Sequence, residues 1–255
     1  MSTMRPGCRT WARTLLLAGG LALAANAAAA GGCRGTLYLT LDTGNMAYAE
    51  AIAETLRRHD VRATFFLANE KTTHGDHVLD AGWFDYWAAR SREGHAFGSH
   101  TWRHGSFLRD VDGGVSYRPQ FPATGVETLD AAGVCAELNR VDTAFRAATG
   151  RGLDPLWRAP GGRTTPAALA AAKSCGYAHV GWAPAGFLGD ELPSEKYPNK
   201  ALVDAAVAKL RDGDIMMMHL GIWSRRDPYA PWLDELLTRL KARGFCFATL
   251  RERAG

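Results

Sequence analysis

The sequence predicts an α/β fold, namely a distorted (β/α)7 barrel formed by a single domain. From residue 37 onward, short apolar runs rich in β-branched and aromatic residues alternate with longer amphipathic stretches, which is typical of parallel strands joined by helices. Cys33 precedes the first run and Cys246 lies inside the last. A disulfide between them would make the first and last strands neighbours. Such a disulfide favours a closed barrel, although the alternation alone fits an open doubly wound sheet equally well.

The predicted strands and helices alternate along the chain. The first strand is the run Leu-Tyr-Leu-Thr-Leu at 37–41, and an amphipathic stretch follows it at 46–59. The run Ala-Thr-Phe-Phe-Leu at 63–67 forms the second strand, and the next helix is expected at 83–92. The remaining strands are expected at 95–98, 156–158, 179–182, 215–219 and 245–250, and the remaining helices at 134–149, 166–174, 201–211 and 231–243.

Two connections, at 72–81 and 105–133, are longer than a simple crossover requires. Loops of this length in a compact domain are commonly functional or mobile. The first contains His74, Asp76 and His77, which are candidate metal ligands. The second contains glycines, prolines and several aromatic residues.

Residues 1–30 have the features of a signal peptide. Arg5, Arg9 and Arg13 precede an apolar stretch at 15–24 and then a run of small residues. The apolar stretch is shorter than the roughly 20 residues of a membrane-spanning helix. We therefore expect a mature domain at 31–255, periplasmic or secreted, with no stable membrane span. Lipid attachment at Cys33 is a weaker alternative, because the position three residues before it is not leucine.

Composition argues against a nucleic-acid partner. The first 30 residues carry three arginines and no other charged side chain, so the formal net charge of +4 becomes +1 once they are removed. The apolar fraction of 47% is ordinary for a soluble globular domain. These values define no oligomeric state.

Four cysteines remain in the expected mature chain. An even number in an exported protein favours disulfides over metal thiolates, and no Cys-x-x-Cys pair is present. Three connectivities are possible. We favour Cys33 with Cys246 and Cys135 with Cys175, because Cys33 lies just before the first strand and Cys246 inside the last, whereas the other two lie in successive helices.

Polar side chains follow four of the predicted strands. Asp42, His100, Arg158 and His219 each come at the end of an apolar run, and the carboxyl ends of parallel strands meet at one edge of a sheet or barrel. His100 and His104 are four residues apart and suit a metal ion, although such a pair by itself is a weak signal. Taken singly, Asp42 fits a turn after a strand, and His219 fits a buried core histidine.

Four segments together resemble, in order and spacing, the polysaccharide deacetylases, also called NodB-homology carbohydrate esterases. These segments are Thr40-Leu41-Asp42-Thr43-Gly44, Ser99-His100-Thr101-Trp102-Arg103-His104, Arg158-Ala159-Pro160-Gly161-Gly162 and Ile215-Met216-Met217-Met218-His219. The resemblance covers nearly the whole mature chain and implies a distorted seven-stranded barrel. It also implies hydrolysis of acetyl groups on sugar polymers with the help of one divalent metal. Zinc is the expected metal, with cobalt or nickel as alternatives.

The resemblance assigns roles to individual residues. His100 and His104 would be metal ligands, Asp42 the general base, and His219 the acid that protonates the departing amine. Arg158 would hold Asp42 through a fork-shaped contact. Trp182 and Pro160 would form an apolar wall around the acetyl methyl group. Two further candidate substrate contacts come from the residues themselves, namely Tyr117 in the long segment 105–133 and Trp223 close to the last of the four segments.

The sequence departs from the family pattern at two places. Thr43 occupies the position of the third metal ligand, where the family has a carboxylate, and a hydroxyl is a much weaker ligand. This change leaves three outcomes: a two-histidine site completed by water or another side chain, a site of lower affinity, or loss of catalysis. The segment expected to tune the acid offers only Asp190 as a partner for His219.

We therefore expect a metal-dependent carbohydrate N-deacetylase that acts on N-acetylated sugars of peptidoglycan or an extracellular polysaccharide. The alternative is a catalytically silent carbohydrate-binding protein of the same fold. A second alternative is another metal-dependent acyl hydrolase, because a fold does not fix a function.

Overall fold

The computed structural model describes residues 1–2 and 32–253. The predicted signal peptide lies outside the described residues except for its first two. From Cys33 onward the described chain forms one compact unit. Its helices and strands, with short 3-10 helices marked η, are β1 (Gly35–Asp42), α1 (Ala49–Arg58), β2 (Thr64–Leu67), η1 (Ala81–Trp83), α2 (Phe84–Arg92), β3 (Ala96–Ser99), β4 (Ser106–Val111), β5 (Gly114–Arg118), β6 (Glu127–Leu129), α3 (Ala131–Thr149), β7 (Leu156–Trp157), η2 (Pro160–Gly162), α4 (Pro166–Ser174), β8 (Ala178–His179), η3 (Pro184–Gly186), α5 (Asn199–Lys209), β9 (Ile215–His219), η4 (Ala230–Trp232), α6 (Leu233–Ala242), β10 (Phe245–Phe247) and η5 (Leu250–Glu252).

A curled parallel sheet forms the centre of the fold, with strand order β10-β1-β2-β3-β7-β8 and with β9 also paired to β1. Between β8 and β9 there is no regular ladder. Instead, the chain that follows β8 runs along β9, where the Ala183 N–H donates to the carbonyl of Ile215 at 3.0 Å. Gly186 permits this approach, because a Cβ atom there would lie 1.9 Å from the same carbonyl oxygen. The predicted distorted barrel is therefore confirmed, and its distortion lies at this irregular seam.

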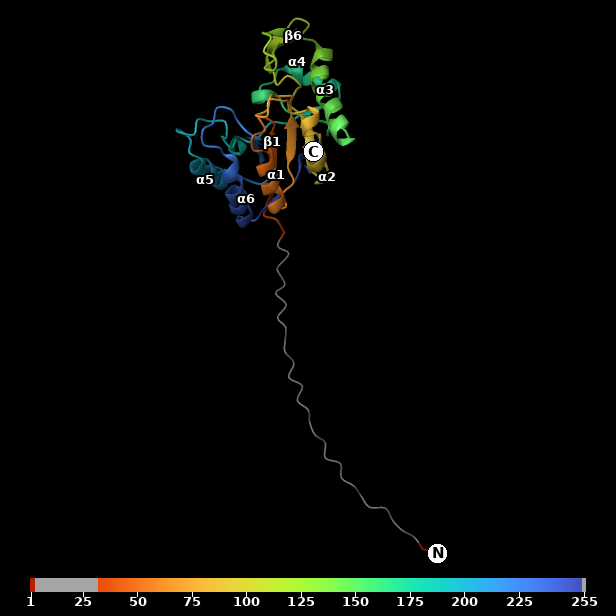
Figure 1. Cartoon of the computed structure of the whole chain (residues 1–255), viewed down its shortest axis with the longest axis vertical. Coiled ribbons are helices and arrows are strands. Elements are labelled where there is room, and N and C mark those ends of the chain that lie inside the picture. The colour runs from red at the N-terminus through yellow and green to blue at the C-terminus, as the bar shows by residue number, and fades with distance from the viewer. Residues whose placement is uncertain (3–31, 254–255) are drawn as a thin grey trace. The chain divides into compact units, whose positions relative to one another are not determined.

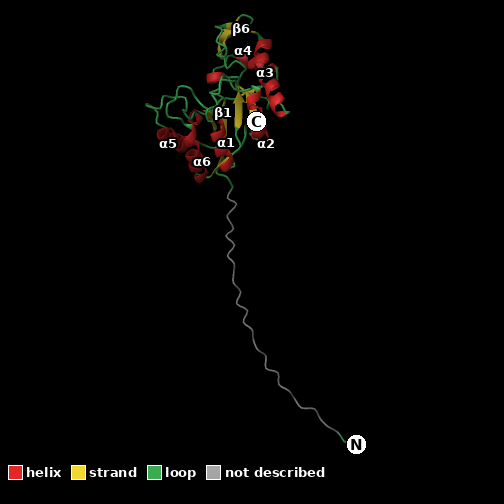
Figure 2. Cartoon of the chain, in the orientation of Figure 1, coloured by secondary structure: helices red, strands yellow, loops and turns green. Residues whose placement is uncertain are grey.

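Side-chain alternation along β1 separates the core from the site. Leu37, Leu39 and Leu41 are fully buried and join the main core cluster with residues of α1 and α6. Since successive side chains of a strand point to opposite faces, Thr40 and Asp42 point to the other face, into the barrel. Helices surround the strands (Figures 1 and 2), with α1 and α5 packed on α6 and with α3 packed on α2 and α4.

All seven predicted strands and all six predicted helices are present, with boundary shifts of a few residues. The largest difference lies at 105–133, which we expected as a loop. This segment contains β4, β5 and β6, which form a three-stranded antiparallel sheet. A glycine pair at the turn between β4 and β5 makes the hairpin possible, because Gly113 and Gly114 have φ values of 77° and 159°.

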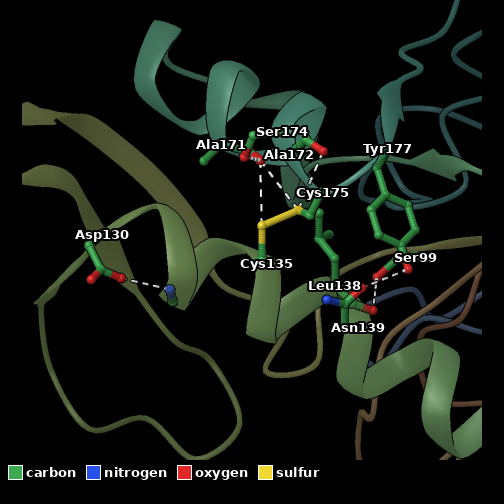
Figure 3. Close-up of a disulfide and its surroundings, with 11 residues drawn as sticks. Ser99, Asp130, Cys135, Leu138, Asn139, Ala171, Ala172, Ser174, Cys175 and Tyr177 are labelled. Atoms are coloured by element: carbon green, nitrogen blue, oxygen red, sulfur yellow. Dashed lines mark hydrogen bonds between the residues drawn. A yellow bond between two sulfur atoms is a disulfide. The ribbon is translucent and has the colours of Figure 1, made fainter.

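Both favoured disulfides are present. Cys33 bonds Cys246 with their Cα atoms 5.6 Å apart, beside the parallel pairing of β1 with β10. Cys135 in α3 bonds Cys175, which directly follows α4, with a Cα separation of 5.9 Å (Figure 3). The sulfur of Cys33 is thus engaged and not free to carry a lipid. No helix within the described residues is long and apolar enough to cross a membrane.

Candidate active site

Asp42 and His219 are register partners at the carboxyl ends of the paired strands β1 and β9. Asp42 is 2% exposed and lies within the barrel. Gly44, which follows it, turns the chain with a φ of 65°, and a Cβ atom there would lie 2.1 Å from the carbonyl oxygen of Gly221. The Asp-Thr-Gly sequence thus ends β1 in a turn that only glycine fits.

Arg158, which directly follows β7, forms a buried ion pair with Asp42. Its Nη1 donates to Oδ1 of Asp42 at 2.8 Å and to the hydroxyl of Thr40 at 2.8 Å. The expected fork-shaped contact is wrong, because Nε and Nη2 donate to the backbone carbonyls of Val180 and Gly181 instead. The irregular chain after β8 leaves those carbonyls without partners in a strand ladder. Arg158 therefore places a positive charge beside Asp42 and also fixes the chain between β8 and β9 by hydrogen bonds.

His100 directly follows β3, and its Nε2 is the ring nitrogen that can donate a lone pair to a metal. Its Nδ1 lies 2.9 Å from the carbonyl oxygen of Arg158, so Nδ1 carries the hydrogen and Nε2 carries the lone pair. That Nε2 is 3.6 Å from Oδ2 of Asp42. A hydrogen bond from the far nitrogen to a backbone carbonyl is the usual arrangement of a metal-binding histidine.

A tight turn brings His104 next to His100, with ring centroids 4.9 Å apart. Thr101 and His104 both adopt left-handed backbone conformations, with φ values of 65° and 48°. Such values are rare for residues other than glycine, and they cluster at functional sites. The Nδ1 of His104 contacts Oε1 of Gln120 at 2.6 Å.

Glu70 is the residue of this site that the sequence analysis missed. It lies three residues beyond β2 and is 6% exposed. Its Oε2 accepts hydrogen bonds from the Thr43 hydroxyl at 2.5 Å and from the Gly44 N–H at 2.7 Å. Its Oε1 is 3.7 Å from Nδ1 of His104. The rule that located Asp42, a carboxylate just past the carboxyl end of a strand, would also have found Glu70.

The polar side chains of the loop at 72–81 contact other residues of the same loop and the neighbouring Trp83. Asp76 accepts hydrogen bonds from the Thr72 hydroxyl and the Trp83 indole, and His74 stacks on the Trp83 ring. His77 faces Asp80 at 3.4 Å. The structure therefore does not bring these three candidate ligands to the pair His100 and His104.

His219 is held by Asp190, as we expected. The Asp190 carboxylate accepts from the His219 backbone N–H at 2.7 Å and lies 3.1 Å from its Nδ1. Glu191 is 3.9 Å from the other ring nitrogen, Nε2. The imidazole is thus oriented by one carboxylate, and Nε2 remains the nitrogen available to a ligand.

The surroundings of Asp42 and His219 shift their pKa values in opposite directions. Burial alone would raise the pKa of Asp42, but the charges of Arg158, His100 and His219 lower it below the usual range. Burial also disfavours a charged His219, yet Asp190, Asp42 and Glu191 together raise its pKa to about 9. At neutral pH this site holds an ionised carboxylate beside a protonated imidazole.

His100 differs from His219 in its charge state. Burial, with a smaller contribution from His104, lowers the pKa of His100 to about 4, against the opposing influence of Asp42 and Glu70. The imidazole is therefore neutral at neutral pH, which is the form that binds metals.

A groove of about 430 Å³ lies over Glu70, His104 and His219, which line it, whereas Asp42 and His100 are buried beneath and do not line it. Its lining residues come from all sides of the site and are Gly44, Glu70, His104, Gln120, Phe121, Glu191, Leu192, His219, Gly221, Ile222, Trp223 and Ser224. Trp223, with 62% of its surface exposed, stands at the rim. Phe121 and Gln120 belong to the segment between β5 and β6, so the small antiparallel sheet places one wall of the groove.

The other expected substrate contacts are placed differently. Tyr117 is fully buried, and its hydroxyl lies between the Gly105 N–H and the Glu137 carboxylate, so it packs in the interior and does not face the groove. Pro160 is buried in η2. Trp182 is partly buried, lies over Arg158 at 5.5 Å, and packs closely on Gly162.

The donor atoms suit a divalent metal in type. His100, His104 and Glu70 form the two-histidine, one-carboxylate set that catalytic zinc uses in other hydrolases. As the side chains lie, no three His, Cys, Asp or Glu residues of the described chain are gathered into a finished metal centre. The Thr43 hydroxyl donates to Glu70 and accepts from the Ala68 N–H at 3.2 Å, so its hydrogen and one of its two lone pairs are engaged.

Residues 30–180 match the family model described as polysaccharide deacetylase. The chain belongs to the polysaccharide deacetylase family. The match includes Asp42, His100, His104 and Arg158. His219 lies beyond the matched residues and enters the site through the pairing of β9 with β1.

Two curated polysaccharide deacetylases illustrate the relationship. The chain is 30% identical over 148 residues to a chitin deacetylase of Pestalotiopsis sp, covering 57% of this chain and 40% of that protein. It is 26% identical over 221 residues to a peptidoglycan-N-acetylglucosamine deacetylase of Listeria monocytogenes, covering 86% of this chain and 39% of that protein. The chain therefore spans about two fifths of the length of each of these relatives.

Solved structures of polysaccharide deacetylases and related esterases share the fold. An acetyl xylan esterase of family 4 from Clostridium thermocellum, in complex with cobalt, has a TM-score of 0.64 at 19% identity, covering 85% of this chain and 89% of that one. A family 4 pseudoenzyme from Bacillus anthracis also has a TM-score of 0.64 at 19% identity, covering 86% and 64%. The family is generally metal-dependent, and it also contains at least one pseudoenzyme.

Proposed function

We propose that this chain is a metal-dependent N-deacetylase of a sugar polymer, acting on N-acetylglucosamine or N-acetylmuramic acid units of peptidoglycan or an extracellular polysaccharide. The observation that carries the proposal is the juxtaposition of Asp42 and His219 with pKa values displaced in opposite directions. A pair of titratable groups whose environments separate their pKa values is suited to divide base and acid chemistry. The family membership supports the same reaction class.

The reaction is the hydrolysis of an acetamide to acetate and an amine. A divalent metal, zinc by expectation and cobalt or nickel as alternatives, would be held by His100 and His104 and would supply Lewis-acid polarisation of the amide carbonyl and a lower pKa for the attacking water. Asp42 accepts a proton from that water as the new carbon–oxygen bond forms. His219 donates the proton on Nε2 to the amine nitrogen as the carbon–nitrogen bond breaks.

The neighbouring residues keep both catalytic groups in the required state. Arg158 keeps Asp42 ionised and fixes its orientation through the 2.8 Å contact. Asp190 keeps His219 protonated and directs Nε2 away from itself. Trp182 and Pro160 are proposed to bound the acetyl methyl group, and Trp223 to stack on a sugar ring at the rim.

The proposal extends to location. Two disulfides fit an oxidising compartment, and the polymers named above lie outside the cytoplasm. We propose that residues 1–30 are a signal peptide and that residues 31–255 act as the catalytic domain in the periplasm or outside the cell.

The alternative function is carbohydrate binding without catalysis. Thr43 at the position of the usual carboxylate favours it, and so does the likeness to the Bacillus anthracis pseudoenzyme. Assays of the zinc-loaded protein on chitin oligomers, peptidoglycan and poly-N-acetylglucosamine decide between the two functions. Release of acetate from at least one polymer supports the deacetylase, whereas metal binding without acetate from any of them would support the binding protein.

A further inference from the structure

We propose that Glu70 supplies the carboxylate ligand that the family pattern places at position 43, so that His100, His104 and Glu70 together hold the metal. This inference rests on the proposed metal-dependent function and names a ligand from a different strand. Glu70 follows β2, whereas the position of the usual ligand follows β1.

The position of Glu70 supports the ligand role. Asp42 and Phe66 are register partners on β1 and β2, so the segments that follow these two strands lie side by side. A glutamate side chain from the β2 segment therefore reaches the space beside residue 43. The 2.5 Å separation between Oε2 of Glu70 and Oγ1 of Thr43 shows that it does so.

One oxygen of Glu70 is fixed and the other faces the groove. Oε2 accepts two hydrogen bonds, from Thr43 and Gly44. Within residues 32–253, Oε1 accepts none, and it lies 3.7 Å from Nδ1 of His104. That nitrogen also contacts Oε1 of Gln120 at 2.6 Å, and because an amide oxygen only accepts, Nδ1 carries the hydrogen and Nε2 is the nitrogen left for a metal. The free oxygen of Glu70 therefore lies beside the His104 imidazole, within the same groove.

This arrangement also explains threonine at position 43. An aspartate there would place a second carboxylate within hydrogen-bonding distance of Glu70, and two adjacent carboxylates repel each other unless one is protonated. Threonine instead donates a hydrogen bond and orients Glu70. In this proposal the carboxylate ligand comes from the segment after β2 and not from the segment after β1. The residue at position 43 then supports that ligand by a hydrogen bond and does not bind the metal itself.

Zinc and cobalt binding to Glu70→Gln tests the inference. Glutamine has the same shape and retains an oxygen that accepts hydrogen bonds from Thr43 and Gly44, so the metal-free melting temperature should change little. Zinc affinity, measured by titration calorimetry, should fall by at least about 100-fold, the upper end of the loss caused by removing a residue that only supports a ligand. The visible absorption of the cobalt form should change as well.

Two further variants sharpen the test. Glu191→Gln is the matched control, because Glu191 lies in the same groove but faces His219, and its zinc affinity should match that of the wild type. In the double variant Glu70→Gln with Thr43→Asp, the carboxylate returns to the family position, and zinc affinity should recover by at least about tenfold relative to Glu70→Gln.

Three results would overturn the inference: unchanged zinc affinity in Glu70→Gln, equal losses in Glu191→Gln and Glu70→Gln, or a wild-type chain that binds neither ion. A lower metal-free melting temperature with unchanged affinity would show that Glu70 is only structural. Acetate release reports separately on the proposed function. If the wild type releases acetate and Glu70→Gln binds zinc as tightly as the wild type, only the ligand role of Glu70 is refuted. If zinc binding depends on Glu70 but no acetate is released, only the proposed deacetylase activity is refuted.

Discussion

The Thr43 hydroxyl donates a hydrogen bond to the Glu70 carboxylate across 2.5 Å and accepts one from the Ala68 N–H. Both side chains are buried. A residue at the family's ligand position is therefore joined directly to a carboxylate from the next strand. The contact makes position 43 important for structure whether or not its hydroxyl meets a metal.

Replacing Thr43 with valine keeps the shape of the side chain and removes both hydrogen bonds. The Ala68 N–H and an oxygen of Glu70 then lose partners inside the protein, which costs about 1–3 kcal/mol for each buried group. Glu70 keeps its hydrogen bond from the Gly44 N–H, so the Ala68 N–H dominates the loss, and we expect the free energy of unfolding, measured by urea denaturation, to fall by about 2 kcal/mol. Thr143→Val on the exposed face of α3 serves as the control and should change stability by less than about 0.5 kcal/mol. Equal stability of the two variants would contradict the prediction.

Replacing Arg158 with methionine leaves Asp42 buried without its positive partner. Removing one member of a buried ion pair typically costs about 3–5 kcal/mol, and the Val180 and Gly181 carbonyls lose their donor as well. We expect a loss of stability in that range, together with a raised pKa of Asp42. Arg239→Met breaks an exposed ion pair with Asp204 and should destabilise the protein far less. A small effect of the Arg158 change in urea denaturation would show that the pair is not needed for folding.

Replacing Asp190 with asparagine removes the largest influence that raises the pKa of His219. Activity requires a protonated His219, so it should fall as pH rises through the pKa of this group. In the wild type this alkaline limb is expected near pH 9, and in Asp190→Asn it should move toward the ordinary histidine range of about 6.5. The dependence of kcat/KM on pH measures the shift. An alkaline limb that stays in place would remove Asp190 from this role.

The same pKa makes stability depend on pH. His219 has a higher pKa in the folded protein, about 9, than the ordinary value of about 6.5 in an unfolded chain. Its stabilising contribution is therefore complete below about pH 6.5 and is lost as pH rises through about 9. The melting temperature of the wild type should fall more steeply between pH 7 and 10 than that of His219→Gln. Parallel curves for the two proteins would be evidence against the buried imidazolium.

Replacing Trp223 with alanine tests recognition of the polymer. A sugar ring that covers about 30–55 Å² of the indole face removes that apolar surface from water at about 25 cal/mol per Å², so KM for a long oligomer should rise roughly threefold to tenfold. The value of kcat should change little, because Trp223 stands at the rim of the groove. An unchanged KM would mean that Trp223 is only an exposed side chain. A variant of the buried Tyr117 should act on stability instead.

The sequence predicted the parts of this protein that depend on local patterns. The alternation of apolar runs located every strand of the barrel, and strand ends located Asp42, His100, Arg158 and His219 at one edge. The contact between Asp190 and His219 and both disulfides also agree with the sequence-based expectations. These positions can be predicted because each residue lies in or beside a strand or helix that the sequence indicates, and the parallel sheet brings the ends of the strands together.

Other features depend on tertiary contacts that have no short pattern. Glu70 lies just past the end of a strand, as Asp42 does, but its contact with Thr43 depends on the pairing of β2 with β1, which no short pattern indicates. Tyr117 lies in a segment that we expected to be a loop, and the antiparallel sheet there buries it. The donors of Arg158 reach Val180 and Gly181 only because β8 ends early and leaves two carbonyls free, which the apolar run at 179–182 does not indicate.

The most direct test of the account is acetate release from N-acetylglucosamine oligomers by zinc-loaded wild type and zinc-loaded Asp42→Asn, with bound zinc measured in both. The account predicts release by the wild type and a loss of at least about 100-fold in the variant, since a positioned general base contributes about 10²–10⁴-fold, while both proteins retain zinc. Equal rates for the two zinc-loaded proteins, or no acetate from either, would contradict it.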